Sequence, residues 1–155
     1  MGKLYVVLNF FVVCLTIIVA EDSQRKNIVA ISSGTSFGEC LGYCRRSITL
    51  RCNGRTLIAL KEPNGVDSAY PPVEKQYKIS STLWNELVDL VNVGRFRSLD
   101  DRIGCPDCAD GGAEWIEIEG KNFKKRVTFE YNQSIEGFDA LVKKLRELRG
   151  KYVAY

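Results

Sequence analysis

Histidine is absent from the 155-residue sequence, and this absence excludes more chemistry than any other feature of the composition. Without imidazole the chain can hold no Ser–His–Asp or Cys–His nucleophile pair, no histidine general base and no histidine-containing zinc site. Carboxylate pairs, lysine, tyrosine or a thiolate remain as catalytic groups, and few small extracellular enzymes work with these alone. The composition therefore favours a protein that is not an enzyme and needs no cofactor.

The sequence also has little excess of either charge, with 22 basic and 19 acidic residues and a formal net charge of +3. The two signs are mixed along the chain, and there is no internal repeat, low-complexity tract or long linker. Nucleic acids and membrane surfaces attract concentrated positive charge. Neither is therefore an expected partner.

The first twenty residues have the layout of a cleaved secretory signal. A lysine precedes an almost wholly apolar run at residues 4–20, and the charged segment EDSQRK follows. This layout is typical of cleavage after Ala20, whereas a membrane anchor would have to span with a run at the short edge of the usual length. We expect a signal peptide over residues 1–20, a loose tail over 21–26 and a single secreted, disulfide-linked domain over 27–155.

A clear hairpin pattern follows in residues 47–60. Asn53-Gly54, the preferred dipeptide of a two-residue type I′ turn, separates two segments rich in β-forming residues. Such a turn places Leu50 opposite Leu57 and gathers the apolar side chains on one face. Turn chemistry and hydrophobic pattern therefore predict the same register.

Residues 114–131 predict a second hairpin. A four-residue loop pairs Ile116 with Val127 on the inner face and sets Glu117 against Arg126 on the outer face. A register that joins apolar pairs on one face and opposite charges on the other is favourable on both counts.

Two segments have the apolar spacing of amphipathic helices. Ser80 or Ser81 caps the first, Trp84 belongs to its core stripe, and Gly94 fits the position just after its C-terminus. The second begins at Ser134 in this interpretation. Its other face and C-terminal end carry cations that we interpret as solvated: Lys143, Lys144, Arg146 and Arg149.

Further strands are expected at residues 27–34 and 73–79. Hairpin-linked strands combined with two amphipathic helices predict an α+β fold. Its expected architecture is an antiparallel sheet of about five or six strands with two helices packed on one face.

Several segments resemble a family of secreted, mostly bacterial α+β domains of unknown function. They are SFGECLGY, ISSTLWNELVDLVNVGRFRSL and GFDALVKKLRELR, and together they cover about residues 27–149. The family's opening motif is Cys-Phe-Gly-x-Cys-Pro-x-Tyr. Residues that match it are Phe37, Gly38, Cys40 and Tyr43, while Ser36 and Leu41 depart from it. The resemblance implies the fold and no activity. It carries over no disulfide, because the first cysteine of the motif is missing.

Of the six cysteines, Cys14 falls within the expected signal, which leaves an odd number in the domain. Cys52 lies at the end of the apolar face of its strand, so we interpret it as a buried, reduced core thiol. The other four form a C-x3-C and a C-x2-C pattern in two separate loops: Cys40, Cys44, Cys105 and Cys108.

Three interpretations compete for these four cysteines. A four-thiolate zinc site is rare where thiols are oxidised. A thioredoxin-like redox pair needs its first cysteine at a helix N-terminus, whereas CPDCADGG leads through two glycines into a strand. Structural disulfides remain, and we expect two bridges that tie the loops together. Both cross-loop pairings stay open: 40–105 with 44–108, or 40–108 with 44–105.

The segment around CPDC is rich in aspartate, but its spacing lacks the alternating pattern of a helix–loop–helix calcium site. We interpret it as a solvated acidic loop in which Asp107 and Asp110 are weak calcium candidates. Asn132-Gln133-Ser134 satisfies the glycosylation sequon just before the last helix. We expect a glycan at Asn132 if the producing cell is eukaryotic.

These observations predict a secreted, non-enzymatic binding protein or matrix-associated protein, whose partner is an unidentified extracellular protein or matrix component. Phe37, Tyr43 and Trp115 are the candidate contact residues. The alternative is a small secreted hydrolase that uses carboxylates, or a thiol oxidoreductase that uses Cys105 and Cys108.

Overall fold

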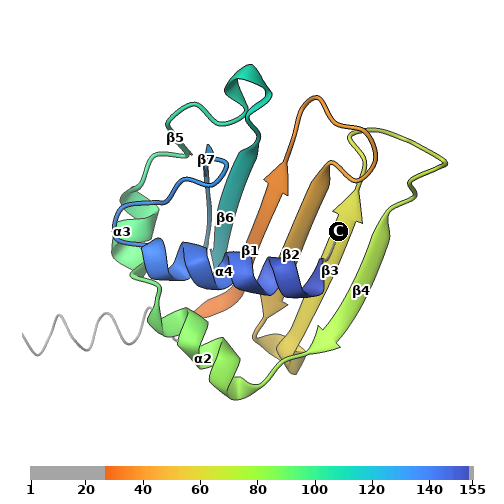
Figure 1. The fold of residues 1–155 in the computed structure, drawn as a ribbon. Helices are drawn as coiled ribbons and strands as arrows, with labels where there is room; N and C mark the ends of the chain where they lie inside the picture. Colours follow the sequence, from red (N-terminus) through yellow and green to blue (C-terminus); the bar gives the residue numbers. More distant parts are fainter. Residues whose placement is uncertain (1–26, 154–155) are drawn as a thin grey trace, which may run out of the picture.

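The computed structural model describes residues 27–153, and a seven-stranded sheet runs through them (Figure 1). The expected signal peptide and tail lie outside the described residues. The strands are β1 Ile28–Ser36, β2 Arg45–Arg51, β3 Thr56–Glu62, β4 Val73–Lys78, β5 Arg102–Ile103, β6 Ala113–Gly120 and β7 Phe123–Glu130. Their order in the sheet is β4-β3-β2-β1-β6-β7-β5. Strand β1, the first among the described residues, is therefore the central one, and it joins the two predicted hairpins.

The predicted fold class, an antiparallel sheet of five or six strands with two helices on one face, is wrong. The two-residue strand β5 pairs with β7 in parallel, which makes the sheet mixed. Residues 27–153 contain three α-helices rather than two: α2 Ser81–Asp89, the short α3 Val93–Ser98 and α4 Asp139–Tyr152. Because β5 and α3 are each only a few residues long, neither has room for a periodic pattern that the sequence could display.

The first hairpin has the predicted register but a different turn. Leu50 pairs with Leu57 as expected. Residues 52–55 make a wider connection around the 3-10 turn η1 Asn53–Arg55, in which the Arg55 backbone N–H donates to the carbonyl oxygen of Cys52 at 3.2 Å. The apolar face alone fixes the register here, since a shift by one residue would turn every buried side chain outward.

The second hairpin agrees with the prediction in every pair tested. Ile116 lies opposite Val127, and Glu117 lies opposite Arg126. The Arg126 Nε donates to the Glu117 carboxylate at 3.0 Å. Lys124 adds a second ion pair to the same carboxylate at 3.0 Å.

The first predicted helix begins where expected but ends early. The Ser80 hydroxyl accepts the Leu83 N–H at 3.1 Å, which confirms Ser80 as the N-cap. Asn92 then accepts the Arg95 N–H at 2.9 Å and caps the new helix α3, so Gly94 lies inside α3 and does not end α2.

The last helix begins later than predicted, at Asp139 rather than at Ser134. Gly137 has a φ of 79°, in the left-handed region, and this interrupts any helical path from Ser134. The apolar stripe itself is confirmed. Its buried members are Phe138, Leu141, Val142, Leu145 and Leu148.

Helix α4 lies across one face of the sheet (Figure 1). Its apolar side chains belong to one core cluster with those of the central strands. Ile31, Ile48 and Ile116 supply fully or almost fully buried side chains from β1, β2 and β6. Trp84 joins the same core, as predicted. The Phe96 and Phe138 rings meet edge to face at 5.4 Å and connect α3 to the start of α4.

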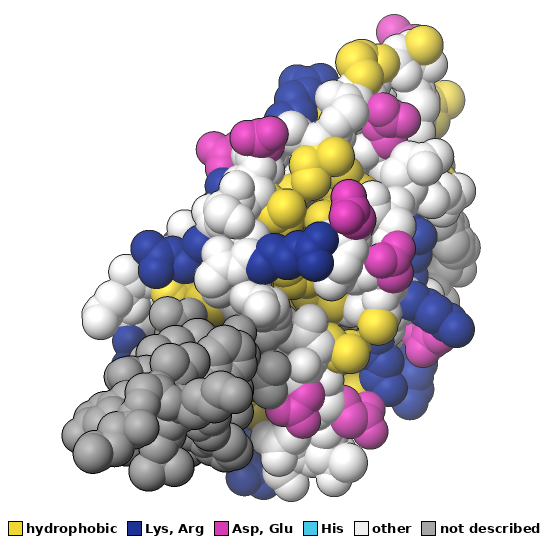
Figure 2. Space-filling view, turned by 90° about the vertical axis from the view of Figure 1, so that its left-hand side faces the viewer, with side chains coloured by type: hydrophobic (Ala, Val, Ile, Leu, Met, Phe, Trp, Pro, Cys, Tyr) yellow, Lys and Arg dark blue, Asp and Glu magenta, His cyan; other side chains and the backbone are white. Residues whose placement is uncertain are grey.

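Figure 2 shows the side of the molecule that carries α3 and β5. Basic and acidic side chains are interspersed there around a band of hydrophobic ones. No single sign of charge dominates this face, as it would on a surface that binds nucleic acid through its phosphates.

Candidate functional site

Antiparallel pairing brings three loops to one end of the sheet (Figure 1). The β1–β2 loop, residues 37–44, and the β3–β4 loop, residues 63–72, lie beside each other there. The β5–β6 loop, residues 104–112, is the third. We call these three loops the loop end.

Two disulfides lie in the loop end, and both bridge within a loop. Cys40 pairs with Cys44 and Cys105 pairs with Cys108, each with a Cα–Cα distance of 5.5 Å. The choice of these four cysteines is therefore confirmed, but the predicted cross-loop pairing is wrong. Cysteines three and four residues apart already meet the Cα spacing that a disulfide requires.

Non-covalent contacts hold the two cysteine loops together instead. The Gly38 backbone N–H donates to Oδ1 of Asp107 at 3.3 Å. The Phe37 ring packs on Gly112, where a Cβ would lie 2.4 Å from the ring. Gly112 has a φ of 81°, so both its backbone and the space beside it require glycine.

Phe37 is half-buried and serves as a link between loops. Its ring meets that of Tyr131 edge to face at 4.9 Å. The Asn64 side-chain amide donates to the carbonyl oxygens of Phe37 and Gly38, both at 2.7 Å. The β3–β4 loop is therefore bound to the first cysteine loop.

Tyr43 makes a second link between the same loops. Its ring meets that of Tyr70 edge to face at 5.6 Å, and its hydroxyl donates to the Pro71 carbonyl at 3.1 Å. The Lys61 ammonium lies 4.5 Å from the ring centroid, a cation–π contact.

Trp115 lies apart from Phe37 and Tyr43. It follows Glu114 on β6, so it points to the sheet face opposite to the one that α4 covers. Its ring lies over Gly34, and the Arg126 guanidinium lies 4.0 Å from its centroid. The structure therefore does not bring the three predicted contact residues into one surface.

Three exposed hydrophobic side chains in the loop end were not predicted from the sequence. Leu41 and Val66 are fully exposed, and Tyr70 is 41% exposed. Leu41 lies between the two cysteines of the first disulfide, and Val66 and Tyr70 belong to the β3–β4 loop. Periodic patterns cannot find such residues, because they lie in irregular loops.

Asp107 and Asp110 both have positive φ angles, 62° and 57°, in the turn around η2 Cys108–Asp110. Asp107 accepts the Gly38 N–H, and Asp110 is exposed. Within residues 27–153, no three Cys, Asp or Glu side chains gather closely enough to hold a metal ion.

Cys52 is an exposed free thiol, so its predicted burial is wrong. Strand β2 ends one residue earlier, at Arg51, and the alternation that would bury Cys52 stops with it. Asn132 is also exposed, with a φ of 64° in the turn between β7 and α4. Its side chain is accessible to modification.

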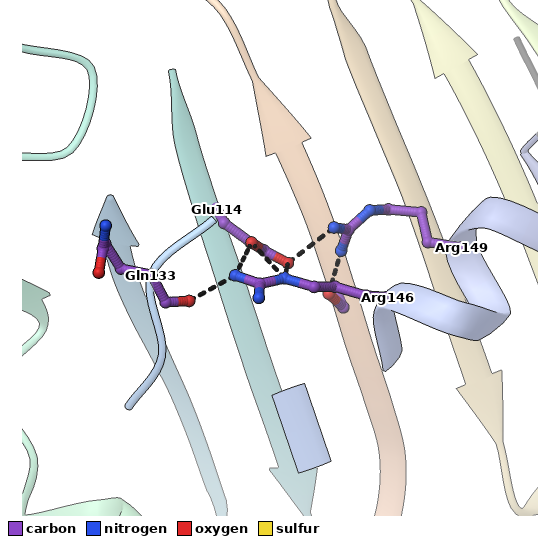
Figure 3. A network of polar contacts seen from close by, with 5 residues as sticks. Glu114, Gln133, Arg146 and Arg149 are labelled. Carbon is purple, nitrogen blue, oxygen red and sulfur yellow. Dashed lines mark hydrogen bonds and ion pairs between the residues drawn. The ribbon is translucent and has the colours of Figure 1, made fainter. Parts of the chain in front are cut away.

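An ion-pair network joins α4 to β6 on the face of the sheet that α4 covers (Figure 3). Glu114 is 1% exposed. Arg146 donates to its carboxylate through Nε and Nη2 at 2.9 and 2.6 Å, and Arg149 donates through Nη2 at 2.7 Å. The prediction that these arginines are solvated is therefore wrong for Arg149, which is buried, while Arg146 is ion-paired but partly exposed.

Further contacts fix both guanidiniums. Arg149 Nη1 donates to the Ser33 hydroxyl on β1 at 2.7 Å, and Arg146 Nη2 also donates to the Gln133 carbonyl oxygen. Arginine donors contact both oxygens of Glu114, so this carboxylate orients the two guanidiniums. The spacing of Arg146 and Arg149 on a helix is the one sequence signal that could have suggested a shared partner.

Two groups on α4 have shifted pKa values. Hydrogen bonding from Ser134 is the main cause that lowers the pKa of Asp139, with backbone hydrogen bonds helping. The hydrogen bond and charge of Glu86 raise the pKa of Lys144. The Lys144 ammonium lies 2.9 Å from the Glu86 carboxylate on α2.

The part of the chain that the structure describes contains no helix long and apolar enough to cross a membrane. A scan against protein-family models finds no match to this chain, and a search of curated proteins finds no similar sequence. The resemblance of the opening motif to a family of secreted domains stays a prediction.

Proposed function

We propose that this chain is a secreted, non-enzymatic binding protein that contacts an extracellular or matrix protein through the loop end. The observation that carries the proposal is the position of Leu41, Val66 and Tyr70. These are the large hydrophobic side chains that stay exposed among residues 27–153, and all of them belong to two adjacent loops. Exposed apolar side chains that gather in one place are typical of protein-contact surfaces.

The loops that carry these side chains are held in place before any partner arrives. The disulfide between Cys40 and Cys44 closes the segment that presents Leu41. Tyr43 packs against Tyr70 and bonds the backbone of the second loop at Pro71. Ordering a loop in advance lowers the entropic cost of binding, which supports a role in recognition.

The surroundings of Cys105 favour this proposal over thiol exchange. A redox-active cysteine gains its low thiol pKa at a helix N-terminus or beside cations. Cys105 follows Gly104, and its backbone N–H donates to the Glu130 carboxylate at 2.8 Å. Among residues 27–153 no α-helix begins at Cys105.

Capture from extracellular fluid or matrix of the producing organism tests the proposal. The protein retains a specific binding partner, and the double variant Leu41→Ser/Val66→Ser loses it because the exposed apolar surface is gone. Glu39→Ser, in the same loop as Leu41, keeps it. Equal capture by both variants would contradict the proposal.

Activity assays test the alternative, that the chain is an enzyme. If insulin is reduced, or a panel of glycans is hydrolysed, and Cys105→Ser or Asp110→Asn abolishes that turnover, the chain is an enzyme. We expect no turnover above the buffer control.

A further inference from the structure

Strand β4 forms an open edge of the sheet. It stands first in the strand order, so β3 pairs with one side of it, and no strand of residues 27–153 pairs with the other side (Figure 1). The opposite edge ends in β5, which is two residues long, whereas β4 is six residues long. An open edge presents unpaired backbone N–H and C=O groups to any further strand. Of the two edges, β4 offers the longer row of these groups.

The backbone of β4 is regular enough to accept another strand. Its pairing with β3 runs without a shift, and no residue within it has a positive φ. The strand contains no proline; Pro71 and Pro72 lie just before it. Bulges and prolines are common ways to block a sheet edge, and exposed lysines are another. Since β4 has lysines alone, the side chains that they would face decide which strand fits.

The backbone groups of β4 that point outward can be assigned. The Ile79 N–H, just after the strand, donates to the Arg55 carbonyl oxygen at 2.9 Å. Backbone groups alternate in direction along an antiparallel strand, so every second residue before Ile79 also bonds toward β3. The residues whose N–H and C=O point away from the sheet are the intervening ones: Glu74, Gln76 and Lys78.

The side chains of β4 divide between the two faces of the sheet. The Tyr77 ring lies 4.7 Å from that of Tyr152 on α4. Tyr77 and Lys75, two residues before it, therefore lie on the face that α4 covers. The three residues with outward backbone groups carry exposed side chains on the other face.

We propose that two copies of this chain join their β4 strands antiparallel about a two-fold axis at Gln76, so that one sheet continues through both copies. Gln76 then lies opposite Gln76 of the second copy, and the two exchange their outward N–H and C=O groups. Glu74 lies opposite Lys78 of the second copy on one face. Lys75 lies opposite Tyr77 of the second copy on the other.

This register is complementary in charge on both faces. Symmetry repeats each contact, so the dimer gains two Glu74–Lys78 ion pairs and two contacts of a Lys75 ammonium with a Tyr77 ring. The Lys78 ammonium donates to the Gly54 carbonyl oxygen at 3.2 Å and has further donors for the ion pair. An axis at Lys75 would set two ammoniums against each other, and an axis at Tyr77 would leave Glu74 with no lysine opposite.

The proposed interface is separate from the apolar surface of the loop end. It uses none of Leu41, Val66 and Tyr70, so the two proposals can fail independently. Because the two β4 strands run in opposite directions, the loop ends of the dimer point away from each other. A dimer therefore holds two partners of the kind proposed above, one at each end.

Sedimentation equilibrium of the purified protein over a series of concentrations tests the proposal. Every sample carries Cys52→Ser, so that the exposed thiol cannot join two copies through a disulfide. We expect a reversible equilibrium between monomer and dimer. A monomer at every concentration would overturn the proposal, and so would a monomer whose β4 strand binds an extended peptide of another protein.

Gln76→Pro and Gln76→Thr form a matched pair. Proline removes the N–H at the axis, which points away from β3, so the chain still folds and the dissociation constant of the dimer rises about tenfold or more. Threonine keeps the N–H and suits a strand, so the constant stays within about threefold of the parent value. Circular dichroism checks that both variants fold. Equal constants for the two would place the contact elsewhere and overturn the proposal.

Charge exchange tests the register without altering the backbone, and it decides the question if Gln76→Pro does not fold. Glu74→Lys or Lys78→Glu alone sets like charges opposite each other at both ends of the interface and weakens the dimer about tenfold or more. The double variant Glu74→Lys/Lys78→Glu exchanges the partners and returns the dissociation constant to within about threefold of the parent value. A double variant as weak as either single one would overturn the register and the proposal with it.

Discussion

Gly34 and Trp115 lie opposite each other on β1 and β6, and at this position a single methyl group decides the packing. A Cβ on Gly34 would lie 2.5 Å from the Trp115 ring. The backbone of Gly34 is ordinary extended strand, so space and not conformation requires glycine here. The indole covers the strand backbone and in turn supports Arg126.

We predict that Gly34→Ala lowers the free energy of unfolding by about 1–3 kcal/mol, the usual cost of overpacking. The displaced indole also leaves Arg126, which changes the tryptophan fluorescence of the native state. Urea denaturation followed by fluorescence measures both effects. Gly65→Ala is the control, because nothing lies within 4 Å of a Cβ there; equal midpoints for the two variants would show that the ring moves at no cost.

Cys52 gives a second prediction at the residue scale. Because the thiol is exposed, native protein lacking residues 1–20 reacts with a thiol reagent at one site per chain without denaturant. Cys52→Ser abolishes the reaction and leaves stability within about 0.5 kcal/mol, as for most surface substitutions. If Cys52 reacts only after unfolding, it is buried in the native protein, as the sequence predicts, and the exposure seen in the structure is contradicted.

At the scale of elements, Glu114 connects α4 to the sheet through two ion pairs, although it carries a single charge. Two arginines depend on it, and one of them, Arg149, is buried. Removing the carboxylate leaves both guanidiniums facing each other without compensation. The attachment of α4 therefore rests on a charged contact in addition to its apolar stripe.

We predict that Glu114→Gln lowers the free energy of unfolding by about 3–5 kcal/mol, the cost of breaking a buried ion pair from one side. Glu119→Gln, the same change on the same strand, costs at most about 1 kcal/mol because that side chain lies on the solvent-facing side of β6. Chemical denaturation of both variants beside the parent chain measures the difference. A loss below about 1 kcal/mol for Glu114→Gln would mean that the arginines are solvated after all.

The start of α4 predicts a pH effect. The hydrogen bond from Ser134 holds the pKa of Asp139 below its ordinary value of 3.8. A depressed pKa in the folded state means that ionised Asp139 stabilises the protein above that ordinary pKa, and that this contribution disappears as the pH falls through the lower folded value. Its position in the first turn of α4 also favours a negative charge.

We therefore predict that Asp139→Asn is less stable than the parent chain at neutral pH, and that the two become equally stable in acid, below the folded pKa of Asp139. Urea midpoints measured across this pH range give the comparison. A difference that stays constant with pH would assign the effect to the shape of the side chain and not to its charge.

Elements with a repeating pattern were predictable, and those defined by tertiary contacts were not. Leu50 and Ile116 lie in registers that hydrophobic alternation specifies locally, and the structure has both. Arg146 and Arg149 look identical in sequence to solvated helix cations. Only the contact with Glu114 on β6, 32 and 35 residues away in sequence, pairs both arginines, and Arg149 is buried there. A polar side chain is buried because of its partner, and the partner is remote in sequence.

At the scale of the whole molecule, the disulfides and the core are separate supports. Both bridges close short segments of the loop end, with sequence separations of 4 and 3, whereas the core lies between α4 and the sheet. Short closed loops restrict the unfolded chain only modestly. The sheet therefore does not depend on either bridge.

We predict that the pair of changes Cys40→Ser/Cys44→Ser, or the pair Cys105→Ser/Cys108→Ser, costs about 2 kcal/mol or less, in line with loop-closure entropy for so short a segment. Far-ultraviolet circular dichroism of each variant keeps the parent spectrum, and thermal unfolding gives the loss. Collapse of the spectrum would show that a bridge supports the sheet itself.

The architecture as a whole was half predictable. Both hairpins and the core stripe of α4 follow from sequence, because each is stabilised by neighbouring residues. The pairing of β1 with both β2 and β6 does not follow, since no local pattern says which strands meet. The first cysteine loop holds two of the predicted contact residues, Phe37 and Tyr43, whereas the exposed hydrophobic residues of the loop end, Leu41 and Val66, carry no signal in sequence.

The central place of β1 has a consequence for synthesis. β1 is the first strand of the domain to leave the ribosome, and β2, β3 and β4 can add to it in order as a meander. Its other edge stays open until β6 emerges, more than seventy residues after β1 ends. During that interval the nascent chain presents unpaired N–H and C=O groups, which are a template for pairing with other chains. The growing chain therefore needs to be kept from pairing with other chains at the free edge of β1. In the folded protein this strand is paired on both sides.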